Sequence, residues 1–214
     1  MASTSTKEPA TKRAHATPIA GGEAQYDIKN DCGEVLFTRE QVAAATKDLG
    51  RRIAADYADK SPLIVPILKG SFIFAADLVR ALEPCPQHMS VEFVSARSYG
   101  AGFETSGEVQ VSFDEAGVKG RHCIMVDDLC DSGLTLVTVR DKLLAAGASS
   151  VQSCVLLDKT ARRKVDFVPD YVGMECPNQW VAGLGMDTNQ MYRGLDQVVV
   201  LKKEAIDRAL AHTH

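Results

Sequence analysis

The sequence of 214 residues lacks several features that would mark particular classes of protein. No stretch approaches the roughly 20 consecutive apolar residues that a membrane-spanning helix needs, which argues against a membrane partner. Basic residues are not in excess, because 24 Lys and Arg face 28 Asp and Glu and the formal net charge is -4. Without a basic stripe, no nucleic-acid partner is expected either.

The N-terminal segment lacks the apolar run of a secretory signal. Residues 1–24 are rich in Ala, Thr and Ser, and we expect them to form a disordered tail, with a transit peptide as the alternative. Residues 25–210 are expected to form a single domain, because about 150 residues is an ordinary domain size.

The cysteines lack C-x-x-C spacing, which argues against a zinc site. Cys123 and Cys154 lie in apolar runs, where cysteine behaves as a small buried side chain. Because no secretory signal accompanies them, all six are expected to be reduced and the protein to be cytoplasmic. The six are Cys32, Cys85, Cys123, Cys130, Cys154 and Cys176.

Stretches of helical and strand periodicity alternate along the chain. Thr38 and Gln41 form a capping box that opens one helix, and Gly147 is placed to end another. This alternation is typical of crossover units, so we expect an α/β fold with a mostly parallel, twisted sheet flanked by helices. Ligands bind such sheets outside the carboxyl ends of the strands. The expected helices cover residues 39–56, 72–82 and 134–146; the expected strands cover 63–68, 91–96, 109–113, 123–126 and 151–157, with two or three more between 166 and 201.

The most informative segment covers residues 124–135, where an apolar strand is followed by a tight turn and at once by a helix. Backbone N–H groups at the start of a helix form a ready anion site. Serine and threonine hydroxyls add donors, and glycine lets the backbone approach a ligand closely. The G-x-x-x-x-G-K-[ST] pattern of a Walker loop is absent, so the segment predicts a site for a phosphate monoester. The expected phosphate-binding residues are Ser132, Gly133, Leu134 and Thr135.

Two carboxylates, Asp127 and Asp128, precede this turn. Carboxylates repel a phosphate, but they accept hydrogen bonds from a diol such as the 2′ and 3′ hydroxyls of ribose. The segment therefore predicts a ribose 5-phosphate, with Asp131 near the reactive face of the sugar. For any one of these residues an N-cap role is the simpler interpretation. A receiver domain is a second alternative, although too little chain follows Asp128 to complete one.

The segment resembles the phosphoribosyl-pyrophosphate (PRPP) binding motif of the type I phosphoribosyltransferases. Four further stretches match in order: Leu-Lys-Gly-Ser at 68–71, Ser-Tyr-Gly at 98–100, Leu-Asp-Lys at 157–159 and Trp-Val-Ala-Gly-Leu-Gly-Met-Asp at 180–187. The last resembles the 6-oxopurine branch, the hypoxanthine-guanine phosphoribosyltransferases of purine salvage. The resemblance covers residues 35–204 and implies a small hood region beside the main sheet. It also implies transfer of the phosphoribosyl group of PRPP to hypoxanthine and guanine, with xanthine left open, giving the nucleoside monophosphate and pyrophosphate.

The same resemblance implies a purine pocket of five residues. Asp131 would accept the N7 proton of the purine as the catalytic base. Lys159 would donate to the 6-oxo group and so reject adenine. Trp180, the only tryptophan, would stack on the base, with core packing as its alternative. Val181 would read the purine edge through its backbone, and Asp187 would border the same pocket.

Pyrophosphate and Mg²⁺ are implied to lie at a second cluster. Lys69 and Gly70 resemble the pyrophosphate-binding turn of the family, in which a non-proline cis peptide is common, and Arg193 resembles its pyrophosphate-binding arginine. Asp187 is the carboxylate expected near Mg²⁺, which keeps mostly substrate and water oxygens as ligands. By themselves, Lys69 and Arg193 would be read as surface charges and Asp187 as a turn residue.

Ser98 and Tyr99 are implied to belong to a mobile loop that closes over the site. The family is usually dimeric or tetrameric, so the expected partners are PRPP, a purine base and further copies of the chain. The sequence departs from the family pattern at Asp127, where glutamate is common, and at Leu134 and Leu184.

A PRPP-sensing regulator, or a transferase for adenine or orotate, is the alternative function. The net acidic charge disfavours the regulator, and the stretches at Lys159 and at 180–187 disfavour the other transferases.

Overall fold

The computed structural model describes residues 28–98 and 109–211. The expected disordered tail, residues 1–24, lies outside these ranges, and so do Tyr99 and most of the expected mobile loop.

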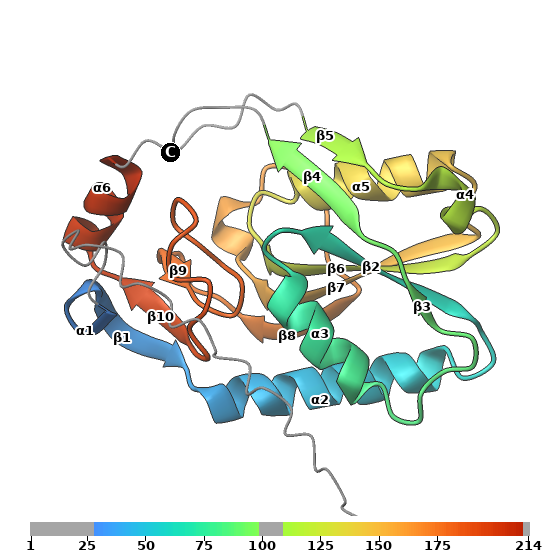
Figure 1. Ribbon diagram of the computed structural model, residues 1–214, viewed down its shortest axis with the longest axis horizontal. Coiled ribbons are helices and arrows are strands. Elements are labelled where there is room, and N and C mark those ends of the chain that lie inside the picture. The colour runs from blue at the N-terminus through green and yellow to red at the C-terminus, as the bar shows by residue number, and fades with distance from the viewer. Residues whose placement is uncertain (1–27, 99–108, 212–214) are drawn as a thin grey trace, which may run out of the picture.

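A large sheet forms the centre of the molecule, in the strand order β5-β4-β2-β6-β7-β8, with β3 also paired to β2 (Figure 1). All its neighbours pair in parallel except β4 and β5, so the predicted mostly parallel sheet is confirmed. Its strands are β2 (Pro62–Leu68), β3 (Ser90–Val91), β4 (Val94–Ser98), β5 (Val109–Ser112), β6 (His122–Cys130), β7 (Ser150–Asp158) and β8 (Tyr171–Glu175).

Helices cover both faces of this sheet, because alternate residues of the central strands point to opposite sides. Ile124 and Val126 of β6 pack with α2 and α3, whereas Cys123 and Met125 pack with α5. Figure 1 shows α2 and α3 below the sheet and α5 above it. The helices are α2 (Arg39–Asp56), α3 (Phe72–Ala81), the short α4 (Glu115–Val118) and α5 (Leu134–Ala145).

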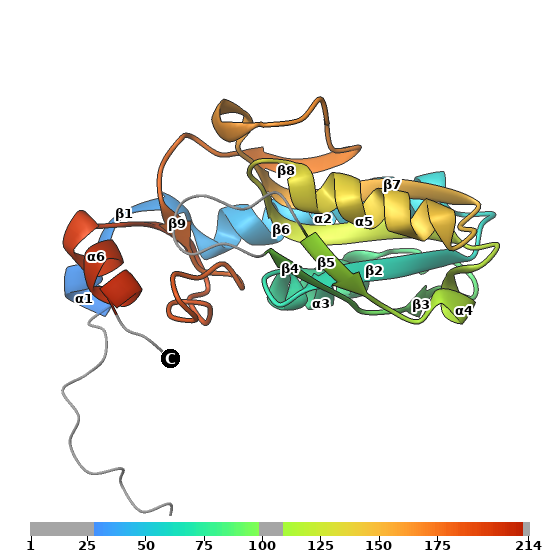
Figure 2. The same cartoon turned by 90° about the horizontal axis from the view of Figure 1, so that it is seen from above.

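A smaller antiparallel sheet, in the order β1-β10-β9, forms the hood that the resemblance implied. It lies beyond the ends of the large sheet, next to the helices α1 and α6 (Figure 2). The first and last described parts of the chain therefore meet there. The elements are α1 (Ile28–Asp31), β1 (Cys32–Phe37), β9 (Val181–Ala182), β10 (Val198–Leu201) and α6 (Lys203–Ala211).

Several element boundaries differ from those expected. The strand expected at 91–96 is split into β3 and β4, and the strand expected at 123–126 extends as β6 from His122 to Cys130. This extension has a clear cause, because β6 keeps pairing with β7 as far as Cys130 and Asp158. Asp127 and Asp128 therefore lie inside the strand rather than after it. The predicted end of α5 is confirmed, since Gly147 adopts a φ of 89° just beyond the helix.

The structure also bears on the cysteines and on membrane-spanning helices. All six cysteines are free thiols, as expected, and four of them are buried. Among the described residues, no helix is both long and apolar enough to cross a membrane.

We predict that Thr38→Ala destabilises the fold by about 0.5–2 kcal/mol, because it removes the N-cap of α2. The Thr38 hydroxyl accepts from the Gln41 N–H, and the Gln41 side chain accepts from the Thr38 N–H in return. Chemical denaturation measures the change. Thr38→Ser keeps the hydroxyl and is the control; equal stability of the two variants would contradict the capping role.

Candidate active site

The predicted site residues gather where β2, β6 and β7 end, facing the hood (Figure 1). This is the edge at which parallel sheets bind their ligands. The end of β6, the loops that follow these strands, and the segment from Trp180 through β9 into the loop before β10 supply the side chains.

The turn between β6 and α5 has the predicted form. Gly133 has a φ of 82° and directly precedes α5, so a left-handed residue makes the turn from strand to helix. The Ser132 hydroxyl accepts from the Leu134 N–H at 3.3 Å, and the Thr135 side chain lies half-buried in the first helical turn. The amides at this helix start can therefore hold an anion.

The acidic pair is almost fully buried. Asp127 and Asp128 are 8% and 9% exposed, and the Asp128 N–H donates to Asp127 Oδ1 at 3.1 Å. Burial raises the pKa of both carboxyl groups, and the neighbouring Asp128 charge raises the pKa of Asp127 further. Hydrogen bonding with the Asp127 side chain and with backbone N–H groups opposes this effect on the pKa of Asp128, and the Arg193 guanidinium opposes it further. Such a desolvated pair gains from a ligand that supplies hydroxyl donors.

The turn after β2 passes between two other segments of the site. The Leu68–Lys69 peptide is cis, as the resemblance implied. A Cβ atom on Gly70 would lie 2.3 Å from Asp128 Oδ2, and a Cβ atom on Gly185 would lie 1.8 Å from the Gly70 carbonyl oxygen. Only residues without side chains allow three segments to approach so closely.

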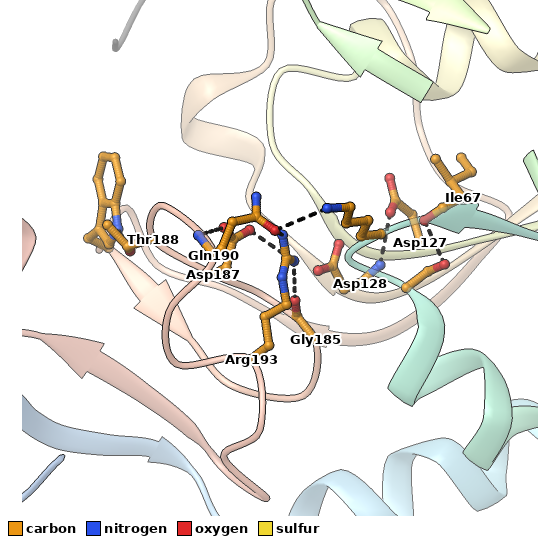
Figure 3. A network of polar contacts seen from close by, with 11 residues as sticks. Ile67, Asp127, Asp128, Gly185, Asp187, Thr188, Gln190 and Arg193 are labelled. Atoms are coloured by element: carbon orange, nitrogen blue, oxygen red, sulfur yellow. Dashed lines mark hydrogen bonds and ion pairs between the residues drawn. The ribbon is translucent and has the colours of Figure 1, made fainter. Parts of the chain in front are cut away.

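A cluster of charged and polar groups surrounds this contact (Figure 3). Arg193 Nη1 donates to the Gly185 carbonyl at 2.6 Å and lies 2.9 Å from Asp187 Oδ1. The Gln190 side-chain oxygen accepts from Arg193 Nη2 at 3.1 Å and from Lys69 Nζ at 3.4 Å. The Gln190 N–H donates to Asp187 Oδ2 at 2.6 Å. The structure thus brings Lys69, Asp187 and Arg193 together as predicted.

Asp131 and Lys159 follow the paired ends of β6 and β7, where Cys130 lies opposite Asp158. The Lys159 N–H donates to the Cys130 carbonyl at 2.9 Å, and the lysine side chain is buried. Asp131 Oδ1 is buried without a hydrogen-bond partner among the described residues. Its other oxygen, Oδ2, lies 3.5 Å from Arg162 Nη1. A buried acceptor without a partner is costly, so this oxygen is suited to a ligand donor.

Trp180 and Val181 lie on the hood side of the site. Trp180 Nε1 donates to the Thr188 hydroxyl at 2.6 Å, directly beside Asp187 (Figure 3). Its ring is partly buried against the small core of the hood, so packing and stacking on a ligand are both open to it. The Val181 side chain is buried in the main core, which leaves only its backbone for recognition, as expected.

A metal at this site would have few protein ligands. Within residues 28–98 and 109–211, no group of three His, Cys, Asp or Glu side chains could hold a metal ion. Asp187 offers a carboxylate beside Arg193. This donor set fits Mg²⁺, which is commonly bound by one or two carboxylates together with water and substrate phosphates.

Comparison with known proteins agrees with this geometry. Residues 34–189 match the model of the phosphoribosyl transferase domain. The chain belongs to the phosphoribosyltransferase family. It is 37% identical to the hypoxanthine-guanine phosphoribosyltransferase of Streptococcus thermophilus, over 85% of this chain and 99% of that protein. It is 37% identical to that of Aquifex aeolicus, over 82% and 98%. A hypoxanthine phosphoribosyltransferase structure from Staphylococcus aureus superposes with a TM-score of 0.77 at 34% identity, over 85% and 98% of the chains.

Three residues of this phosphoribosyltransferase were missed in the sequence. Gly185 and Gln190 contact the Lys69–Gly70 turn. Gly185 lies in the family stretch at 180–187 but was given no role there, and Gln190 carries no sequence signal. Arg162 pairs with Asp131 and could have been found, since it follows Lys159 by three residues in the same loop. Ser98 ends β4, while Tyr99 lies outside the described residues, so the loop remains a prediction.

We predict that Gly70→Ala lowers PRPP-dependent turnover of this phosphoribosyltransferase by about 10²-fold, because misplacing a reacting group by an ångström can cost that much. The new methyl group would collide with the Asp128 carboxylate. Steady-state kinetics measure the loss. The matched control is Gly194→Ala, where a Cβ atom meets nothing within 4 Å. Equal activity of the two variants would show that the close approach is unimportant.

Proposed function

We propose that this phosphoribosyltransferase transfers the phosphoribosyl group of PRPP to hypoxanthine and guanine in purine salvage. One observation carries the choice of a 6-oxopurine: the unpartnered oxygen of Asp131 lies at the same sheet edge as the buried Lys159. A protonated N7 and a 6-oxo group would match this acceptor and donor. The named relatives, which are similar over nearly their whole lengths, support the same substrates.

PRPP would be held from three sides. Its 5-phosphate would take the amides at the start of α5 and the hydroxyls of Ser132 and Thr135. Its ribose diol would donate to Asp127 and Asp128, which relieves two buried acceptors. Its pyrophosphate would lie against the positive charges contributed by the second cluster. Lys69 and Arg193 supply these charges, and the Gly70 backbone allows close approach.

Transfer then requires one bond to break and one to form. The C1′–oxygen bond of PRPP breaks with its electron pair leaving on pyrophosphate, and purine N9 bonds to C1′. As N9 becomes positive, the N7 proton passes to Asp131, which acts as the general base. Trp180 would hold the purine by stacking, worth about 1–3 kcal/mol. Positioning and charge stabilisation by fixed groups supply the rest.

We also propose that Mg²⁺ accompanies PRPP, with Asp187 as the protein carboxylate near it. When bound, the ion neutralises charge on the pyrophosphate. Asp187 is already held by Arg193 and by the Gln190 N–H, so its carboxylate is fixed before the substrate arrives. The second assignment of Asp187, to the edge of the purine pocket, is compatible with its position beside Thr188 and Trp180.

The assembly and location of the protein stay predictions. A homodimer or homotetramer is supported by large apolar side chains that are exposed, among them Phe72 at the start of α3 and Phe93 just before β4. Closure of the loop that begins at Ser98, a cytoplasmic location and the absence of a nucleic-acid partner likewise rest on the sequence.

We predict turnover of hypoxanthine and guanine, and none of adenine, when each is assayed with PRPP and Mg²⁺. Adenine carries a 6-amino donor, which would face the Lys159 ammonium and leave it unpaired. Formation of the nucleoside monophosphate is followed for each base, with xanthine in parallel. Adenine turnover at a similar rate would refute the role of Lys159. PRPP binding without turnover of any base would refute the enzyme and leave a PRPP sensor.

We predict that Asp131→Asn lowers kcat about 10²–10⁴-fold, because the amide keeps the shape but cannot take the N7 proton. Single-turnover kinetics with saturating PRPP separate this effect from binding. Asp166→Asn, at an exposed position of the following loop, is the control and should leave kcat unchanged. A kcat close to that of the unmodified protein in Asp131→Asn would assign the proton transfer to another group.

A further inference from the structure

The loop between β9 and β10 carries Asp187, Gln190 and Arg193, yet its backbone is strained. Four non-glycine residues in it have positive φ: 52° at Leu184, 48° at Asn189, 69° at Gln190 and 70° at Tyr192. Side chains disfavour this conformation, so it persists only where the surroundings hold it. Two isolated bridges, 183 to 186 and 188 to 191, and backbone hydrogen bonds between its two arms, such as Gly185 N–H to the Arg193 carbonyl at 3.0 Å, hold part of it.

Side-chain contacts from α1 and α6 hold the loop from outside. The Tyr192 hydroxyl donates to Asp31 Oδ2 at 2.9 Å, and the Arg208 guanidinium donates to Asp31 Oδ1. Asp31 ends α1 and Arg208 lies in α6, so these contacts join the first and last described helices to the loop (Figure 1). We call Asp31, Tyr192 and Arg208 the hood clamp.

The three side chains of the hood clamp hold one another in place. The Asp31 carboxylate is 3% exposed, and a buried carboxylate needs its partners strongly. Burial and then the Asp31 carboxylate raise the pKa of Tyr192 to about 12, so its hydroxyl stays a proton donor at neutral pH. The Asp31 carbonyl also accepts from the Lys202 N–H at 3.0 Å, which ties α1 to the end of β10.

A second contact repeats the arrangement three residues earlier. Asn189 Nδ2 donates to the Ala209 carbonyl in α6 at 2.9 Å. Asn189 and Tyr192 contact the hood, whereas the residues that directly follow them, Gln190 and Arg193, contact the site. Each hood contact therefore lies one residue from a group at the pyrophosphate cluster.

We propose that Asp31, Tyr192 and Arg208 are positioning residues that hold the Asp187–Arg193 segment ready for the pyrophosphate of PRPP. The proposal rests on the proposed function, in which Arg193 binds pyrophosphate. Under this proposal the affinity for PRPP depends on α1 and α6, which are not among the elements proposed to bind PRPP. Asp131 and Lys159, the groups proposed to hydrogen-bond the purine, follow β6 and β7 outside this segment, so the KM for the purine should change less than the KM for PRPP.

The test uses Tyr192→Phe, which removes one hydroxyl and keeps the ring in its apolar cluster. We expect the KM for PRPP to rise about fivefold or more, with the KM for the purine and kcat changed less than about twofold. Calorimetry with pyrophosphate and Mg²⁺ should show the same weakening without turnover. Arg208→Gln should act alike, and Arg208→Lys should recover part of the affinity because it keeps the charge.

Tyr171→Phe is the matched control. The Tyr171 hydroxyl also donates to a carboxylate, Asp56 Oδ2, at 2.7 Å, but this pair joins β8 to the end of α2, at the opposite end of the large sheet from the hood. This control should lose thermal stability and keep its KM for PRPP.

An unchanged KM for PRPP in both Tyr192→Phe and Arg208→Gln would overturn the proposal. So would an equal rise in Tyr171→Phe, which would indicate general destabilisation. Failure of the proposed function would be distinct, because the unmodified protein would then turn over no 6-oxopurine.

Discussion

The contact between Gly70, Asp128 and Gly185 is the constraint on which the site depends. The Gly70 backbone lies between the buried Asp128 carboxylate and the Gly185 backbone, and neither glycine has room for a Cβ atom. These residues come from three parts of the chain that are far apart in sequence. Their contact fixes the Lys69–Gly70 turn against strand β6 on one side and against the loop between β9 and β10 on the other. The relative positions of Lys69, Asp128 and Arg193 follow from it.

Under the proposed function, the negative and positive charges around this contact would serve different parts of one substrate. The acidic pair in β6 is desolvated, which raises the pKa of both carboxyl groups and favours ligands that donate hydrogen bonds. Lys69 and Arg193 share the Gln190 oxygen as acceptor. A sugar with a diol at one face and a pyrophosphate at the other matches both. The uncharged amides at the start of α5 would hold the third group, the 5-phosphate, in the proposed complex.

Local sequence signals predicted the parts of this structure whose causes are local. The capping box at Thr38 placed α2, and the order of strand, turn and helix around Gly133 placed the phosphate turn. The hood was different. The sequence chemistry gave no signal for α1, β1 or α6, because their stability comes from contacts across 160 or more residues, such as Asp31 with Tyr192. The contacts of Gln190 could not be predicted either, because its left-handed backbone conformation, which the sequence does not reveal, sets the direction of its side chain. Roles at Lys69, Asp187 and Arg193 came only from the family resemblance, because a single charged residue has no pattern of its own.

A crystal structure with bound guanosine monophosphate tests the central claim most directly, namely that one edge of the large sheet holds phosphate, ribose and purine together. The account predicts the phosphate within hydrogen-bond distance of the amides at the start of α5, the ribose hydroxyls on the acidic pair and the purine between Lys159 and Trp180. A groove of about 720 Å³ lies between α2, α3 and the loop between β9 and β10. A nucleotide bound in that groove, with no nucleotide at the end of β6, would contradict the account.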